Sequence, residues 1–272
     1  MNDFKDIRLV AVDMDGTLLN GRHEYDPGFP EIYRQLRQQG ILFAPASGRQ
    51  LYNLQHKFGE LGKEMIFIAE NGSHVQYKGH DLLVQALPAD KVHDLIGMAR
   101  SVEGIDIILC GKKRAYMEST APEFLRNVEM YYEERMIVDD LLAVSGDDFL
   151  KIAICDLRGA EANSYPVFRH LEGELQVKVS GTIWLDLSHQ LANKGRAMQV
   201  VQQHLNISAE QTMAFGDYLN DVEMMRQAFF SYAMSNAHPE VKQAARYIAG
   251  SNEKNGVGVV LQEVLQAFAV LR

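Results

Sequence analysis

The stretch Asp13-Met14-Asp15-Gly16-Thr17-Leu18-Leu19 governs how the rest of the chain is interpreted. It follows an apolar run over residues 9–12, which is typical of a strand buried on both faces of a parallel sheet. Carboxylates at the carboxyl end of such a strand stand where open α/β sheets bind ligands. Because Asp13 and Asp15 would share one cleft, each raises the pKa of the other unless a cation lies between them. The pair therefore indicates a divalent metal, with an ordinary Asp-Gly turn as the alternative.

The composition is that of an ordinary globular protein, with 47% hydrophobic and 23% charged residues among 272. A net charge of −9 argues against nucleic acid and anionic membranes as partners. The polar N-terminus lacks a secretory signal, and no apolar run is long enough to span a membrane. Cys110 and Cys155 lack metal-ligand spacing and are expected to be buried free thiols, or else a disulfide. We expect a cytoplasmic protein, and its oligomeric state stays open.

The order of apolar runs and helical patterns predicts the architecture. Strands over 7–12, 41–46 and 65–69 alternate with helices over 27–40 and 50–58, which indicates a doubly wound parallel α/β sheet. A hairpin over 75–84 interrupts this alternation, and the pattern from there to about residue 181 is α+β. The alternation resumes with a strand expected at 183–187. We therefore predict a core of residues 1–82 and 183–272, with residues 83–182 inserted as a second domain.

Polar residues follow the second and third predicted strands as well. Ser47-Gly48-Arg49 lies between a strand and a helix, so a hydroxyl and free amides would lie near the positive N-terminus of that helix and point one way. Such a site suits an anion, although Ser47 as a simple helix N-cap is the alternative. Glu70-Asn71-Gly72 follows the third strand in the same way.

Two further groups lie late in the sequence. Lys194 opens a predicted helix, where a cation opposes the helix dipole, so its charge is either functional or merely solvated. Asp217, Asn220 and Asp221 follow a buried strand over 212–215, and Asp221 is alternatively an N-cap. Acids, a cation and hydroxyl donors at neighbouring strand ends fit Mg²⁺-assisted phosphoryl transfer through a carboxylate nucleophile.

Together these segments resemble the four motifs of the haloacid dehalogenase superfamily, over essentially the whole chain. The segments are Asp13-Met14-Asp15-Gly16-Thr17, Ser47-Gly48-Arg49, Lys194-Gly195 and Gly216-Asp217-Tyr218-Leu219-Asn220-Asp221. The inserted α+β region looks like the type-two (IIB) cap. With Glu70-Asn71-Gly72 and the segment 233–237, the chain is similar to the Cof-type sugar-phosphate phosphatases.

The resemblance implies a role for each matching residue. Asp13 would attack phosphorus, and Asp15 would protonate the leaving alkoxide and later deprotonate water. Mg²⁺ would bind Asp13, the Asp15 carbonyl and Asp217. The phosphoryl group would contact Ser47, Gly48, Lys194 and Asn220. Supporting or substrate contacts are expected from Thr17, Arg49, Asn71 and Asp221.

The sequence therefore predicts a Mg²⁺-dependent phosphatase of small phosphorylated metabolites, with sugar phosphates as the expected class. A phosphomutase or phosphotransferase using the same aspartyl phosphate and a non-catalytic phosphometabolite sensor are the alternatives. Tyr218 is bulkier than the residue common at its position and is expected to narrow the pocket. In the inserted domain, the Lys112-Lys113-Arg114 turn is either a substrate contact or a solvated basic turn.

Overall fold

The computed structural model describes residues 4–269, which form two sheets, one of eight strands and one of six. The larger sheet has the order β14-β13-β12-β1-β2-β3-β4-β5. Its strands from β14 to β3 run parallel, whereas β4 and β5 form an antiparallel hairpin at one edge. The strands are β1 Leu9–Asp13, β2 Leu42–Ala46, β3 Ile66–Ala69, β4 His74–Tyr77, β5 His80–Val84, β12 Thr212–Gly216, β13 Phe230–Met234 and β14 Tyr247–Ala249.

Helices connect the parallel strands and cover the sheet. α1 contacts β2 and α9, whereas α6 contacts α7 and the strands β3 to β5. The central strand β1 is buried at every residue, as a strand between two helical layers must be. The predicted doubly wound α/β core is therefore confirmed. Its helices are α1 Phe29–Gln38, α2 Leu51–Phe58, α6 Lys194–Leu205, α7 Val222–Gln227, α8 Pro239–Ala244 and α9 Gly256–Ala269.

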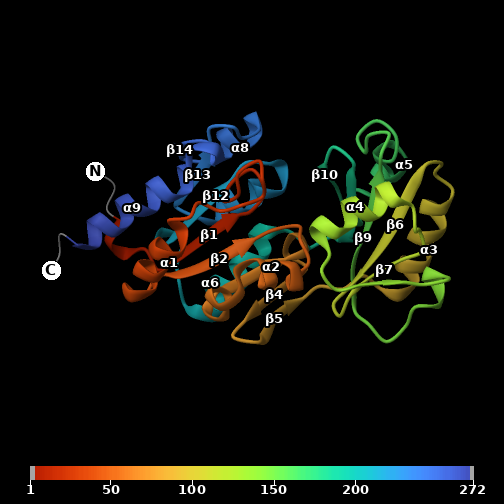
Figure 1. Cartoon of the computed structure of the whole chain (residues 1–272), viewed down its shortest axis with the longest axis horizontal. Helices are drawn as coiled ribbons and strands as arrows, with labels where there is room; N and C mark the ends of the chain where they lie inside the picture. Colours follow the sequence, from red (N-terminus) through yellow and green to blue (C-terminus); the bar gives the residue numbers. More distant parts are fainter. Residues whose placement is uncertain (1–3, 270–272) are drawn as a thin grey trace.

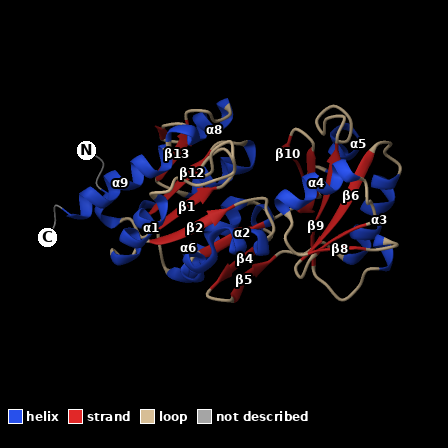
Figure 2. Ribbon diagram, viewed as in Figure 1, coloured by secondary structure: helices blue, strands red, loops and turns tan. Residues whose placement is uncertain are grey.

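The second sheet has the order β10-β11-β9-β6-β7-β8 and is antiparallel except where β7 pairs with β8. The elements of this inserted region are α3 Ala89–Arg100, α4 Pro122–Tyr131, α5 Tyr165–Phe168, β6 Ile105–Gly111, β7 Ala115–Met117, β8 Arg135–Ile137, β9 Phe149–Asp156, β10 Leu175–Gly181 and β11 Trp184–His189. Figure 2 shows its strands as a group apart from those of the larger sheet.

Side chains alternate along the strands of the second sheet and build a core on each face. Ile107 and Leu109 of β6 pack in one cluster with residues of α3 and α5. Ile108 and Cys110 of the same strand point the other way and pack in a cluster with residues of α4. Cys110 and Cys155 are buried and free, as expected.

One predicted strand lies in the other sheet. The residues expected at 183–187 to return to the core instead begin β11, which pairs antiparallel with both β9 and β10. Gly181 pairs with Trp184, so only two residues connect β10 to β11. The glycine at position 181 is a local turn signal for this tight hairpin, and the predicted boundary did not take it into account. The predicted return at residue 183 is therefore wrong, and the chain leaves the second sheet after His189.

The carboxyl ends of the parallel strands face the inserted region. The arrows of β1 and β2 point toward the second sheet in Figure 1. A cavity of about 590 Å³ lies at this junction and is lined by residues of both parts. Among the helices of residues 4–269, none combines the length and the apolar character that crossing a membrane requires.

Candidate active site

The first motif forms a sharp turn directly after β1. Gly16 has a φ of +83°, a left-handed conformation that glycine adopts without steric cost. A Cβ atom on Gly16 would also lie 2.4 Å from Oδ2 of Asp217. Next to this contact, the Thr17 hydroxyl donates a hydrogen bond of 2.8 Å to Oδ1 of Asp217. The turn thus presents Asp13 and fixes the orientation of Asp217.

Lys194 lies fully buried between two carboxylates. Its Nζ is 2.5 Å from Oδ1 of Asp13 and 2.7 Å from Oδ1 of Asp221. Burial alone would lower the pKa of Lys194, but attraction by Asp13 and Asp221 raises it above its ordinary value. The alternative of a solvated lysine is therefore wrong, and the position at the start of α6 holds a permanent cation beside Asp13.

Three carboxylates surround the same point. One oxygen from each of Asp13, Asp217 and Asp221 lies within 4.8 Å of the other two. Burial and repulsion by Asp221 raise the pKa of Asp13 well above its ordinary value, and the same two causes raise that of Asp217 to about 6. Negative charge thus remains in excess although Lys194 is present. Oxygen donors with uncompensated negative charge fit a Mg²⁺ ion.

Asp221 has partners on both of its oxygens. Besides the contact of Oδ1 with Lys194, Oδ2 accepts the amides of Asp217 at 3.0 Å and Tyr218 at 3.1 Å. Asp221 is the N-cap residue of α7 by position, as the alternative held, but its side chain makes no capping hydrogen bond to that helix. These contacts hold Lys194 and the loop at Asp217 and Tyr218 in place. They agree with the supporting role that was expected of Asp221.

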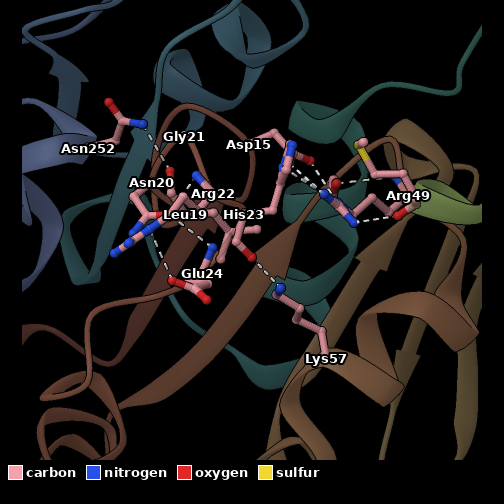
Figure 3. Close-up of polar contacts among 12 residues, drawn as sticks. Asp15, Leu19, Asn20, Gly21, Arg22, His23, Glu24, Arg49, Lys57 and Asn252 are labelled. Atoms are coloured by element: carbon pink, nitrogen blue, oxygen red, sulfur yellow. Dashed lines mark hydrogen bonds and ion pairs between the residues drawn. The ribbon is translucent and has the colours of Figure 1, made fainter. Parts of the chain in front are cut away.

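Asp15 points into the cavity and is held by two side chains (Figure 3). Arg49 donates two parallel hydrogen bonds, from Nε to Oδ2 at 2.7 Å and from Nη2 to Oδ1 at 2.6 Å. His23 Nδ1 lies 2.9 Å from Oδ1. Burial alone would raise the pKa of Asp15, but the hydrogen bonds and charge of Arg49 lower it below its ordinary value. In this arrangement Asp15 is a carboxylate.

The loop that carries His23 is braced on several sides (Figure 3). His23 adopts a left-handed φ of 59°, and its carbonyl accepts a hydrogen bond from Lys57. The Asn20 side chain accepts the amides of Arg22 and Glu24. His23 was not among the predicted site residues, because a single histidine among polar loop residues belongs to no recognisable motif.

The second motif forms the part of the cavity next to Asp13. Ser47 is buried, and its Oγ accepts the Arg49 amide at 3.1 Å. The N-cap of α2 is Gln50, so the interpretation of Ser47 as that cap is wrong. Across the cavity floor, Asn220 donates to Oδ1 of Asn71 at 2.9 Å.

Most of the predicted site residues therefore converge on one cavity. Its lining includes Asp13, Asp15, Ser47, Gly48, Arg49, Asn71, Asp217 and Asn220. Lys194, Thr17 and Asp221 are buried beside these residues and contact Asp13 or Asp217. Tyr218 also lines the cavity, at 38% exposure.

The segment that begins α2 also binds the inserted region. Arg49 Nη1 donates to the carbonyl of Met130 at 2.9 Å, at the end of α4. Gln50 pairs with the backbone of Glu134 in both directions, donating to its carbonyl and accepting its amide, each at 2.9 Å. Arg49, which holds Asp15, therefore also connects the core to the inserted region.

A buried charge cluster that was not predicted from the sequence joins the two parts at another point. Lys151 of β9 is 2.9 Å from Glu70, 3.4 Å from Asp186 and 3.0 Å from the carbonyl of Gly48. Asn71 donates to the same Asp186 oxygen at 2.9 Å. Attraction by Asp186 and Glu70 raises the pKa of Lys151 despite its burial. The sequence held one signal that Lys151 is buried. Ala153 and Cys155, on the same face of β9 as Lys151, are apolar and are themselves buried.

The basic turn of the inserted region lies elsewhere. Lys112, Lys113 and Arg114 are all described, and none of them lines the cavity. Lys112 instead pairs with Asp81 of β5 at 2.6 Å, and Lys113 Nζ donates to the carbonyl of Gly146. The turn is therefore no part of this site.

A model of the haloacid dehalogenase-like hydrolase family matches residues 10–261. The chain belongs to this family. An Escherichia coli K12 relative named 5-amino-6-(5-phospho-D-ribitylamino)uracil phosphatase YbjI is 35% identical, covering 96% of this chain and 97% of its own. An HMP-PP phosphatase of Shigella flexneri is 30% identical over 86% of each chain. The crystal structure of SMU.1108c from Streptococcus mutans has a TM-score of 0.87 and 28% identity, covering 96% and 99%. As a haloacid dehalogenase-like hydrolase with phosphatase relatives, the protein is an enzyme of the predicted class.

Proposed function

We propose that the protein is a Mg²⁺-dependent phosphatase that hydrolyses small phosphorylated metabolites through an aspartyl phosphate. The observation that carries this proposal is the placement of Asp13 beside Lys194 and Asp217, on the floor of a cavity shared with the inserted region. The relatives named as phosphatases of small phosphorylated compounds support it. Sugar phosphates stay a prediction within this class.

The first step is attack by an Asp13 carboxylate oxygen on phosphorus. A bond forms between Asp13 and phosphorus while the bond from phosphorus to the leaving alcohol breaks, and Asp15 donates a proton to the departing alkoxide. In the second step, Asp15 takes a proton from water, whose oxygen displaces Asp13 and yields free phosphate. Lys194 and the Ser47–Gly48 loop, with Asn220, would bind the phosphoryl oxygens as charge develops on them.

A bound Mg²⁺ would supply electrostatic neutralisation of the phosphoryl oxygens. We assign the carboxylates of Asp13 and Asp217 as its ligands, because the acid cluster carries excess negative charge. The carbonyl of Asp15 is added as a third ligand on the family resemblance alone. Thr17 orients Asp217, and Asp221 holds the Lys194 ammonium group next to Asp13.

The inserted region would act as a cap that excludes water during the first step. Asp15 must carry a proton when the alkoxide leaves, whereas Arg49 holds it here as a carboxylate. We infer that substrate binding loosens the Arg49–Asp15 pair, and that the protonated form then appears. The free buried thiols support a reducing compartment, and we place the enzyme in the cytoplasm.

The decisive experiment is Asp13→Asn assayed for Mg²⁺-dependent phosphate release from a panel of phosphorylated metabolites. We expect a loss of about a thousandfold or more, since the nucleophile is removed. Asp139→Asn, outside the cavity, is the control for a single charge loss. Appreciable remaining turnover in folded Asp13→Asn, or full activity in EDTA, would contradict the proposal. Free phosphate, rather than a new ester on an added sugar alcohol, is the expected product.

A further inference from the structure

The roof of the cavity differs chemically from its floor. The floor carries Asp13, Asp15 and Asp217 with Arg49 and His23. The inserted region contributes large apolar side chains, namely Met130, Tyr131, Ile183 and Trp184. Met130 is 41% exposed although it lines a cavity. Exposed apolar surface inside a concave site is the kind of surface that a ligand covers on binding.

Two of these side chains form a fixed aromatic corner. Tyr131 is the last residue of α4 and Trp184 the first of β11. Their ring centroids lie 5.8 Å apart at an interplanar angle of 82°. The Arg49 guanidinium lies 5.0 Å from the Tyr131 centroid and fixes that ring further. A flat ring entering this corner can stack on one aromatic face and meet the edge of the other.

The roof offers no unpaired charge to a ligand. Of the described roof residues, Lys151 is the one cation, and it is buried against Glu70, Asp186 and the Gly48 carbonyl. A second phosphate or carboxylate on the leaving group would find no counter-ion there. The roof also has the small polar side chains of Asn127, Ser180 and Thr182, which suit hydroxyl groups.

We propose that the enzyme prefers phosphate monoesters whose leaving group carries an uncharged heteroaromatic ring on a hydroxylated arm, with Trp184 as the main specificity-determining residue. This inference rests on the proposed phosphatase function and adds the class of its substrate. The phosphate occupies the charged floor, the arm passes the small polar side chains, and the ring packs in the Tyr131–Trp184 corner. A cavity of about 590 Å³ has room for all three parts.

The first test compares two substrates that differ at the anomeric carbon. Uridine 5′-phosphate has a neutral pyrimidine where ribose 5-phosphate has a hydroxyl group, so the ratio of their kcat/KM values reports mainly on the ring. We expect a ratio of about ten or more in the natural protein, and a fall of about tenfold in Trp184→Ala, in the range of one lost stacking contact. Trp184→Phe, which keeps a ring, should retain most of the ratio.

Leu157→Ala is the matched control, because Leu157 is an exposed apolar residue of the inserted region outside the cavity. It should leave the ratio unchanged. Equal kcat/KM for both substrates, or a ratio that Trp184→Ala does not alter, would overturn the inference while the phosphatase function stands. Absence of phosphate release from either substrate and from p-nitrophenyl phosphate would instead remove the proposed function itself.

The second test needs no turnover. Trp184 is the only tryptophan in the sequence, so its fluorescence reports on this corner alone. In Asp13→Asn with Mg²⁺, uridine 5′-phosphate should change the tryptophan emission saturably, and ribose 5-phosphate should compete without a comparable change. Identical responses to the two ligands, or no response to uridine 5′-phosphate that demonstrably binds by calorimetry, would contradict stacking on Trp184.

Discussion

Arg49 binds Asp15 through two parallel hydrogen bonds, and the same guanidinium donates to the carbonyl of Met130 in the inserted region. The state of the proposed acid/base is thereby connected to the position of the cap. A bidentate guanidinium–carboxylate pair is stronger and more directional than a lysine contact would be.

Arg49→Gln should raise the pKa of Asp15, because it removes the hydrogen bonds and positive charge that lower it. The limb of the pH–rate profile set by Asp15 should move to higher pH. Arg34→Gln removes an exposed pair with Glu31 and serves as the control. If the pH–rate profile does not shift, Arg49 does not set the pKa of the acid/base Asp15 during turnover.

Lys194→Met should abolish activity and lower the free energy of unfolding by roughly 3–5 kcal/mol, because it leaves two buried carboxylates without their partner. Thermal or urea unfolding without metal measures this. The double variant Lys194→Met/Asp221→Asn removes one of those charges and should recover part of the stability without activity. If the single variant unfolds like the natural protein, the lysine does not compensate the acids.

Mg²⁺ should stabilise the protein more above pH 6 than below it. The pKa of Asp217 is raised from 3.8 to about 6, so its contribution to stability is present below pH 3.8 and is lost as the pH rises through 6. Above that pH the ionised acids repel one another until a cation binds, whereas protons compete with the metal at lower pH. Melting temperatures with and without Mg²⁺ across this range test the effect. Asp217→Asn should remove most of it, and a shift independent of pH would contradict it.

Gly16→Ala and Gly79→Ala form a matched pair. Both glycines have left-handed φ values, of 83° and 77°, so alanine strains the backbone at each by roughly 1–2 kcal/mol. Around Gly79 nothing lies within 4 Å, whereas at Gly16 the new Cβ meets the Asp217 carboxylate. Calorimetric Mg²⁺ affinity should therefore fall in Gly16→Ala and not in Gly79→Ala. Equal affinities in the two variants would show that the Asp217 carboxylate can move away from the new Cβ without weakening Mg²⁺ binding.

Gln50→Ala should lower kcat/KM about tenfold, because it removes two hydrogen bonds to the Glu134 backbone between the core and the inserted region. Gln55→Ala, in the helix that follows Gln50, removes only a contact to Gln76 within the core and should have little effect. Both variants should melt near the natural protein. Matching kinetics in the two would mean that this contact does not influence turnover.

The core and its motifs were predictable because each depends on local sequence. Apolar runs that end in acids specify buried parallel strands with ligand-binding ends, and the motif order then places Asp13, Ser47, Lys194 and Asp217 together. Even the unfavourable position of Lys194 at a helix start was informative, since a cost without local gain suggested a functional charge.

The contacts between the two parts were beyond such reasoning. Lys151 occupies an alternating strand, where a lysine is expected in solvent, and only the tertiary fold brings Glu70 and Asp186 to it. His23 was missed because only the conformation of its loop, with a left-handed φ at His23, brings its ring to Asp15. The strand β11 was assigned to the wrong sheet because apolar alternation fits either sheet, and pairing alone distinguishes them.

The path of the chain around β11 has an evolutionary consequence. The insertion leaves the larger sheet after β5 and returns at α6, and these two elements are in contact. Its two attachment points therefore lie side by side at one edge of the core, so the whole roof can be exchanged for another without altering the order of the core strands. Chimeras joined after Val84 and before Asn193 would keep the catalytic floor and inherit a new substrate range from the donor.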